Sequence, residues 1–284
     1  MFLCCNLDTY MIVKLIIFTR YTDMKTFITT LLLIVISCSA FSQKYMNING
    51  LRMYYELKGE GQPLLFIHGG GMCTEAYQKE INRLSKRYKV IAADNQAQGR
   101  TNDIGREISY KNMANDQIAL LDSLGIDSVI VFGHSDGGVV GLYMTLFAQK
   151  RVSKLIVSGT NYKASGILDQ FTELLKGATP EGFQNDFFNR LSPDGPNHWP
   201  VVFGKLKKMW INKPNISNEE LNSIKKPTLI IVGDHDMIKI NHTIEMFKNI
   251  KGANLLVVPN ASHEVLNEKT DFVFPLIFDF IGKN

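Results

Sequence analysis

A serine lies between two glycines at the end of an apolar run, in the stretch VIVFGHSDGG over residues 129–138. The four apolar residues before Gly133 favour a β-strand, and the small and apolar residues after the serine favour a helix. A serine at the apex of a strand, turn and helix is a nucleophile elbow, and glycine two positions either side of Ser135 avoids the clashes of so sharp a turn. A glycine-rich turn with a capping serine would explain the five central residues alone, but the flanking strand and helix favour the elbow.

Short β-rich runs alternate with longer helical stretches after residue 44. The first two runs predict a hairpin that turns at Asn49 and Gly50. Continuous apolar strands that alternate with helices predict an α/β fold, in which a mostly parallel sheet carries helices on both faces. The predicted strands are 45–49, 51–57, 64–67, 88–93, 128–132, 154–158, 228–232 and 254–258, and the predicted helices are 74–87, 111–124, 136–149 and 269–282.

The alternation is interrupted over residues 160–222, which are rich in aromatic residues, prolines and glycines. We expect this segment to be a short helical cap that is inserted over the sheet. Its aromatic side chains are expected mainly to pack, although some must face the cleft if the segment forms its roof. They are Phe171, Phe183, Phe187, Phe188, Trp199, Phe203 and Trp210.

Residues 1–42 predict an N-terminal extension and a secretory signal peptide. Lys25, an apolar run over 26–36 and small residues up to Ser42 have the pattern of such a signal over about 24–42. The apolar run is short for a membrane span, so cleavage after Ser42 is favoured over a retained anchor. Lipidation of Cys38, in a loose lipobox, is the minority alternative. Met24 is an alternative start, because the preceding 23 residues fit the signal awkwardly. We therefore expect a secreted or periplasmic protein.

Charge and cysteine content argue against nucleic-acid binding and against an intramolecular disulfide. The net charge is +4, and no basic cluster is dense enough for nucleic acid; a solvated helix face explains the densest run, Lys205, Lys207 and Lys208. After cleavage only Cys73 remains, so we expect no intramolecular disulfide, and a domain of about 240 residues has a core large enough to fold without one. We expect no stable membrane partner after cleavage, and the sequence does not indicate an oligomeric state.

A serine hydroxyl needs a base to accept its proton, and the base needs an acid to orient it. In such sheets these groups collect at the carboxyl ends of strands. Asp236 follows the predicted strand 228–232 and His263 follows the strand 254–258, so we predict that they are the acid and the base. Asp234 is the alternative acid, but it is more typical of a turn. The chain order serine, aspartate, histidine is the order that accompanies this elbow.

Other histidines have plainer interpretations. We expect His134 to pack beside the turn and His235 and His242 to be solvated, while His198 in the insertion could reach a substrate. No spacing of histidines, cysteines and carboxylates predicts a metal site, and no cofactor is expected.

Negative charge that develops on a carbonyl oxygen during acyl transfer needs two backbone N–H donors. One is expected from Asp136, the residue after the nucleophile. The other is expected from the glycine run after the strand 64–67, where Gly70 is the best candidate. A flexible turn is the alternative interpretation of that run.

These motifs together resemble the α/β-hydrolase superfamily. They are HGGG at 68–71, GHSDGG at 133–138, GDHD at 233–236 and His263, and the resemblance covers nearly all of residues 45–284. It implies an eight-stranded, mostly parallel sheet over a domain of residues 43–284, and it makes Ser135, Asp236 and His263 nucleophile, acid and base. Ser262 stands where the family usually has glycine, which is a departure in the loop. The turn over 94–100 resembles a structural turn of the family.

The Ser-Asp-Gly-Gly elbow is similar to that of biphenyl hydrolase-like esterases, in which the aspartate helps to hold a substrate amine. The resemblance implies that Asp136 contacts a cationic substrate group; the alternative is that it caps the helix or faces solvent. The implied function is cleavage of a small carboxylic ester through an acyl-enzyme. Amide or peptide hydrolysis, carbon–carbon bond hydrolysis and cofactor-free perhydrolysis use the same triad and stay open. A non-catalytic binding protein on this scaffold is the competing class.

Overall fold

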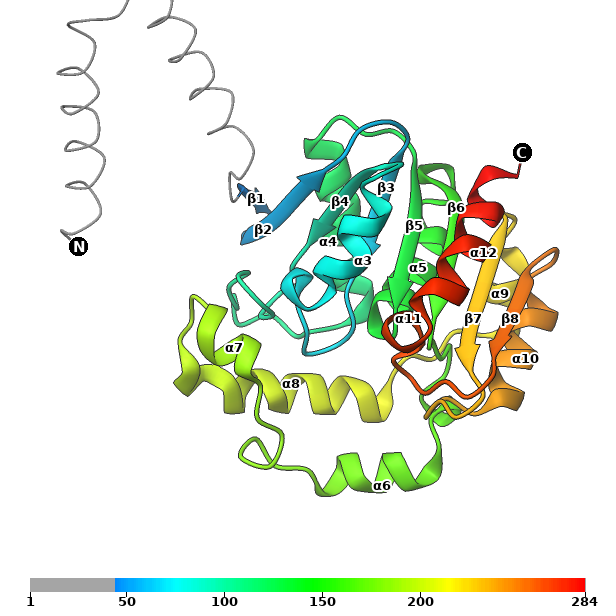
Figure 1. Ribbon diagram of the computed structural model, residues 1–284. Coiled ribbons are helices and arrows are strands. Elements are labelled where there is room, and N and C mark those ends of the chain that lie inside the picture. Colours follow the sequence, from blue (N-terminus) through cyan, green and yellow to red (C-terminus); the bar gives the residue numbers. More distant parts are fainter. Residues whose placement is uncertain (1–43, 284) are drawn as a thin grey trace, which may run out of the picture. The chain divides into compact units, whose positions relative to one another are not determined.

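The computed structural model describes residues 44–283, which form one eight-stranded sheet flanked by helices (Figure 1). The signal-peptide prediction falls on residues that lie outside this range. The strands lie in the order β1-β2-β4-β3-β5-β6-β7-β8, which confirms the predicted α/β fold. Their bounds are β1 (Lys44–Ile48), β2 (Leu51–Lys58), β3 (Pro63–Ile67), β4 (Lys89–Ala93), β5 (Val129–His134), β6 (Val152–Ser158), β7 (Thr228–Gly233) and β8 (Asn254–Val258).

The predicted hairpin is present at the edge of the sheet. Asn49 has φ 50° and Gly50 has φ 86°, so both turn residues are left-handed, as a two-residue hairpin turn requires. The hairpin strands β1 and β2 are antiparallel, and β2 is antiparallel to β4. The remaining neighbours pair in parallel, so the sheet is mostly parallel.

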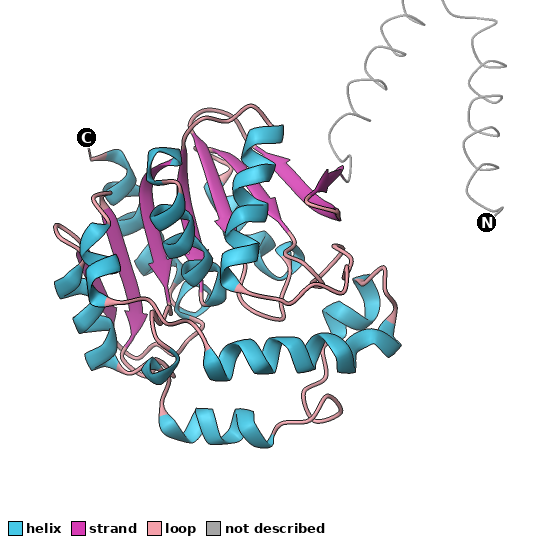
Figure 2. Ribbon diagram, turned by 180° about the vertical axis from the view of Figure 1, so that it is seen from behind, coloured by secondary structure: helices cyan, strands magenta, loops and turns pink. Residues whose placement is uncertain are grey.

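Helices cover both faces of the sheet (Figure 2). In β5, Val131 packs into the core shared with α4 (Tyr110–Ser123) and α5 (Asp136–Phe147). Its neighbours Ile130 and Phe132 face the core shared with α3 (Gln78–Leu84) and α12 (Thr270–Gly282). Because both faces are covered, every residue of β5 is buried, which explains its uninterrupted apolar sequence.

One predicted helix differs from the observed one by more than two residues. The helix expected over 74–87 begins with the 3-10 turn η3 (Thr74–Tyr77), and α3 ends at Leu84 because residues 85–88 form the turn into β4. The helix expected over 269–282 is preceded by the separate turn α11 (Val265–Glu268). The other core helices are η4 (Gln149–Arg151) and α10 (Ile240–Asn249). No helix within residues 44–283 is long and apolar enough to cross a membrane.

Residues 160–222, which we call the cap, are helical. Figure 1 shows α6 and α8 beyond the ends of the strands to which the arrowheads of β5 and β7 point. The aromatic residues pack largely against each other: the ring centroids of Trp199 lie 5.2 Å from those of Phe188 and 5.7 Å from those of Phe203. The cap elements are η5 (Ala164–Gly166), α6 (Asp169–Gly177), α7 (Asp186–Leu191), η6 (Pro196–His198), α8 (Trp199–Asn212) and α9 (Asn218–Ser223).

Candidate active site

Ser135 is the single residue that connects β5 to α5, and its backbone dihedral angles are φ 54° and ψ −122°. This conformation is strained for a residue with a side chain. The flanking glycines are required by close packing, because a Cβ on Gly133 would lie 2.1 Å from the carbonyl oxygen of Gly137. A Cβ on Gly137 would lie equally close, at 2.1 Å, to the carbonyl oxygen of Ile67. The backbone therefore has the elbow geometry that the sequence predicts.

Ser135, His263 and Asp236 follow three parallel strands, and the structure brings them together in one hydrogen-bonded chain. His263 Nε2 lies 2.9 Å from Ser135 Oγ, and His263 Nδ1 lies 2.8 Å from Asp236 Oδ1. The N–H of Ile238 also donates to Asp236 Oδ1, at 3.0 Å, and so orients the carboxylate. Since a carboxylate only accepts, Nδ1 carries a proton and Nε2 is free to accept the serine hydroxyl.

Asp234, the alternative acid, is not part of this chain. Its Oδ1 accepts the N–H of Ala261 at 3.2 Å and lies 2.7 Å from Nδ1 of the exposed His235. The bond from Ala261 ties the loop after β7 to the loop after β8. Asp234 is therefore a turn residue, and of the two carboxylates the geometry selects Asp236.

The protonation of His263 is governed by two opposing effects. Burial lowers the pKa of its imidazole, but the hydrogen bond and the negative charge of Asp236 outweigh burial, so the pKa is raised above its ordinary value. The ring of His134 lies 5.0 Å from that of His263, centroid to centroid. Burial and the neighbouring His263 hold the pKa of His134 well below its ordinary value, so His134 packs beside the turn as a neutral ring, as expected.

The glycine loop, residues 68–71, passes beside the nucleophile: a Cβ on Gly69 would lie 3.4 Å from that of Ser135. Two of its amides are already bound, because Gly69 N–H donates to Tyr77 Oη at 3.3 Å and Gly71 N–H donates to Gln98 Oε1 at 2.7 Å. The N–H of Gly70 has no acceptor within residues 44–283.

The N–H of Asp136 also has no acceptor within residues 44–283, because it belongs to the first turn of α5, where amides have no intrahelical acceptor. The amides of Gly70 and Asp136, the pair predicted from the sequence, are thus the ones left free.

The turn over residues 94–100 supports this loop and takes no part in the hydrogen-bonded chain. Asp94, which is fully buried, accepts the N–H of Thr74 at 2.7 Å and that of Arg100 at 2.8 Å. The N–H of Asn95 donates to His68 Nε2 at 3.0 Å, and Nδ1 of His68 donates to the carbonyl of Gly69 at 2.8 Å. The turn is structural, as expected, and fixes the start of the glycine loop.

The carboxyl group of Asp136 accepts hydrogen bonds from two other elements. Tyr110 Oη of α4 donates to Oδ1 at 2.8 Å, and Trp210 Nε1 of α8 donates to Oδ2 at 2.7 Å. The side chain neither caps α5 nor faces solvent, since it makes no capping bond and the residue is 9% exposed; this corrects the alternative interpretation.

Burial raises the pKa of this carboxyl, although the bonds from Trp210 and Tyr110 act in the opposite direction. The contact to a substrate amine stays a prediction, and an amine would share oxygens that already accept these bonds.

Two histidines lie elsewhere than expected. His242 is buried, and its Nε2 accepts the backbone N–H of Tyr162 at 3.1 Å, so the expectation of a solvated ring is wrong. His198 is held at 2.9 Å from Asp103 Oδ2, so it joins the cap to a core loop and its side chain is already engaged. His235 is exposed, as expected.

The lysines of α8 are not one solvated face. Lys205 Nζ donates to both carboxylate oxygens of Asp103, at 2.9 and 2.7 Å. Lys207 Nζ donates to the carbonyls of Lys176 and Ala178, at 2.7 and 2.8 Å. Lys208 is exposed, so the expectation holds for that residue alone.

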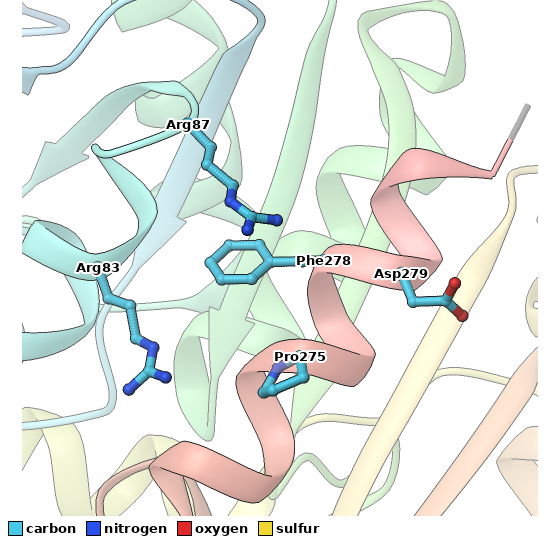
Figure 3. Close-up of a pocket in the computed structure, with 5 residues that line it drawn as sticks. All are labelled: Arg83, Arg87, Pro275, Phe278 and Asp279. Atoms are coloured by element: carbon cyan, nitrogen blue, oxygen red, sulfur yellow. The ribbon is translucent and has the colours of Figure 1, made fainter.

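No group of histidines, cysteines and carboxylates within residues 44–283 could hold a metal ion. A surface hollow between α3 and α12 lies outside the candidate site and contains none of its residues (Figure 3). There the guanidinium of Arg87 lies over the ring of Phe278, 4.5 Å from its centroid. The hollow is lined by Arg83, Arg87, Pro275, Phe278 and Asp279.

Comparison with known proteins agrees with this architecture. A family model described as the alpha/beta hydrolase fold matches residues 62–198. A non-heme haloperoxidase of Rhodococcus erythropolis is 26% identical over 272 residues, which cover 82% of this chain and 97% of that protein.

Two solved structures share the fold. A meta-cleavage product hydrolase of Pseudomonas fluorescens has a TM-score of 0.73 at 22% identity, over 84% of this chain and 97% of that one. An enol-lactonase of Burkholderia xenovorans has a TM-score of 0.66 at 20% identity, over 84% of this chain and 100% of that one.

An eight-stranded sheet with a serine elbow at its carboxyl edge defines the α/β-hydrolase fold. The family-model match over residues 62–198 and the shared fold support an α/β-hydrolase superfamily member. This similarity supports a hydrolase as the class of enzyme. Because the similar proteins are named for different reactions, it does not specify the bond that is cleaved.

Several residues around the site have no signal in the sequence. Tyr77 and Gln98 hold the glycine loop, while Tyr110 and Trp210 hold the Asp136 carboxyl. Each is a polar side chain on an otherwise ordinary helix or turn. Only the expectation that some cap aromatics face the cleft anticipates any of them, namely Trp210.

Proposed function

We propose that this protein is a serine hydrolase that cleaves small carboxylic esters through an acyl-enzyme. The observation that carries the proposal is the hydrogen-bonded chain from Ser135 through His263 to Asp236, set beside two free backbone amides. A nucleophile, a base, an orienting acid and an oxyanion site within reach of one another are the parts that acyl transfer needs.

In the first half-reaction, Ser135 Oγ forms a bond to the ester carbonyl carbon while its proton passes to His263 Nε2. The N–H groups of Gly70 and Asp136 donate to the oxyanion of the tetrahedral intermediate. Asp236 stabilises the imidazolium through its hydrogen bond to His263 Nδ1. The carbon–oxygen bond to the alcohol then breaks, and His263 returns the proton to the departing alcohol.

In the second half-reaction, water attacks the acyl-enzyme. His263 Nε2 accepts a proton from the water while its oxygen bonds to the acyl carbon. The intermediate collapses with release of Ser135, which regains its proton from His263. The products are one carboxylic acid and one alcohol, and the enzyme returns to its starting state.

The choice of an ester rests on a structural neighbour, since His263 could give its proton to a departing alcohol or to a departing amine. The enol-lactonase is named for a lactone, which is a cyclic ester. The haloperoxidase and the meta-cleavage product hydrolase are named for other reactions, which keep perhydrolysis and carbon–carbon bond cleavage as competing activities.

Hydrolysis of p-nitrophenyl acetate and labelling by a fluorophosphonate probe test the proposal together. We expect turnover by the wild-type protein and one probe adduct on Ser135. Ser135→Ala should abolish both, whereas Ser165→Ala, at an exposed serine of the cap, should change neither. Absence of labelling in the wild type would favour a binding protein instead.

The bond that is preferred is tested with matched substrates. Esters, lactones, aminoacyl amides and a carbon–carbon cleavage substrate are compared by kcat/KM. The proposal requires kcat/KM for the ester or lactone to exceed kcat/KM for the amide and for the carbon–carbon substrate by at least about tenfold. This is the scale of a difference of about 1.4 kcal/mol in barrier. A higher kcat/KM for the amide or for the carbon–carbon substrate would make that compound, and not an ester, the preferred substrate class.

We also propose that the protein is exported and that residues up to Ser42 are removed. The proposal rests on the signal-like pattern of residues 24–42. Intact-mass measurement of the protein from the periplasm or medium of a bacterial host should give a chain that begins at Gln43. A chain that begins at an acylated Cys38, and is lost in Cys38→Ser, would indicate lipidation instead.

A further inference from the structure

The cap contacts the glycine loop and the elbow from two directions. Asn185, the N-cap residue of α7, donates from Nδ2 to the carbonyl of Gly71. Trp210 of α8 donates to Asp136 Oδ2 at 2.7 Å, and that oxygen lies against Gly70, where a Cβ would stand only 2.0 Å away. Each proposed oxyanion donor therefore lies beside a hydrogen bond that comes from the cap.

The glycine loop depends on these partners for its shape. Consecutive glycines have little conformational preference of their own, so their amides point where neighbouring groups hold them. The core holds the peptide before Gly70, because Gly69 O accepts from His68 Nδ1 at 2.8 Å and from Met72 N–H at 3.2 Å. On the other side of Gly70, the carbonyl of Gly71 is held by Asn185.

Trp210 also keeps a competing acceptor away from the oxyanion site. Without the indole N–H, the buried carboxyl oxygen of Asp136 would need another donor. The free N–H groups beside it are those of Gly70 and of Asp136 itself, the two donors that the mechanism reserves for the oxyanion. A carboxylate that occupied them would exclude the developing negative charge of the intermediate.

We propose that Trp210 and Asn185 are positioning residues through which a seated cap keeps the oxyanion donors correctly placed and unoccupied. The inference rests on the proposed acyl-transfer function, and it adds that the cap takes part in shaping the catalytic step. Loss of either contact should therefore act on kcat more than on KM.

The variants are Trp210→Phe, which removes the indole N–H and keeps an aromatic ring, and Asn185→Ser, which keeps an N-cap oxygen and removes the amide donor. Each should lower kcat on p-nitrophenyl acetate about tenfold, less than the roughly 10²–10³ of losing an oxyanion donor outright, with KM within about twofold. The matched control is Trp199→Phe, because Nε1 of Trp199 donates only within the cap, to Pro180 O and Phe183 O. It should leave kcat within about twofold.

A second measurement does not depend on turnover. In protein labelled with [15N]glycine, the Gly70 amide resonance should shift in Trp210→Phe and Asn185→Ser and stay unchanged in Trp199→Phe. An unchanged resonance in both test variants, or equal kcat losses in the test and control variants, would overturn the inference. If the wild type is inactive, or Ser135→Ala is as active as the wild type, the proposed function fails, and the resonance shifts alone then decide whether the cap is coupled to Gly70.

Discussion

The imidazole of His242 stacks on the ring of Tyr162, with 4.1 Å between the centroids and 11° between the planes. His242 Nε2 accepts the backbone N–H of Tyr162, so this nitrogen is unprotonated in the folded protein. A Cβ on Gly166 would lie 2.3 Å from the His242 ring, so the segment that enters the cap is closely fitted around it. The contact ties α10 to the entrance of the cap.

This contact predicts that stability falls in mildly acidic solution. Burial lowers the pKa of His242 to about 4, whereas an unfolded histidine titrates near about 6.5. The unfolded chain therefore takes up the proton first, and the free energy of unfolding decreases as the pH falls from about 6.5 to 4, by on the order of 2 kcal/mol. Urea denaturation across this range should show a smaller pH dependence for His242→Gln. His235→Gln, at an exposed position, should behave like the wild type; equal slopes in all three proteins would contradict the assignment.

A second pH prediction concerns the rate. The base His263 must be neutral, and because Asp236 raises its pKa, the acid limb of kcat/KM should have its midpoint above about 6.5. Asp236→Asn removes the charge, so burial should then dominate and move the midpoint to lower pH. The same change should lower kcat by about 10³–10⁴-fold, because an asparagine amide can also donate to Nδ1 and so no longer enforces the imidazole tautomer that leaves Nε2 free to accept. A midpoint that does not move in Asp236→Asn would show that Asp236 does not set this pKa.

A methyl group at Gly70 should damage the oxyanion site. A Cβ there would lie 2.0 Å from Asp136 Oδ2 and 2.9 Å from Trp210 Nε1, so the loop must shift. Gly70→Ala should lower kcat by about 10²-fold or more, the scale of a lost oxyanion donor. Gly204→Ala is the control within the cap, because no atom lies within 4 Å of its Cβ position. It should retain full activity and gain up to about 1 kcal/mol in free energy of unfolding as a helix-interior replacement.

The charge of Asp136 can be separated from its hydrogen bonds. In Asp136→Asn, the amide oxygen can accept from Trp210 while the amide nitrogen donates to Tyr110 Oη, so the geometry is kept and the charge is lost. If the carboxylate binds a substrate amine, kcat/KM on an alanine ester with a free amine should fall about tenfold or more, while that on p-nitrophenyl acetate changes by less than about threefold. Equal losses on the two esters would leave Asp136 without a role in recognising cations.

The three residues of the hydrogen-bonded chain were accessible from the sequence for a physical reason. Each lies in the turn or loop that follows a strand with an apolar run, and parallel strands bring their carboxyl ends to one edge of a sheet. Ser135 is marked further by its glycines, which the packing of the turn requires. Asp234 and Asp236 both follow the same strand, and Asp236 was preferred only because it lies further into the loop. The structure agrees with that choice.

Contacts of the cap could not be predicted in the same way. Trp210 and Asp136 are 74 residues apart, and Lys205 and Asp103 are 102 apart. A lysine on a helix face has the same local pattern whether it meets solvent or a carboxylate on another loop. His242 likewise depends on Tyr162, 80 residues earlier, so its burial has no local signature.

The separation of the proposed catalytic residues from the cap has a consequence for protein engineering. Ser135, Asp236 and His263 all lie outside residues 160–222, so a cap from another protein with this fold could be transplanted without replacing them. A transplanted cap would nevertheless lack the indole of Trp210 and the amide of Asn185, unless its own sequence has equivalent side chains at these positions. Chimeras should therefore be designed around these two points of attachment, which define where the interchangeable part of the molecule ends.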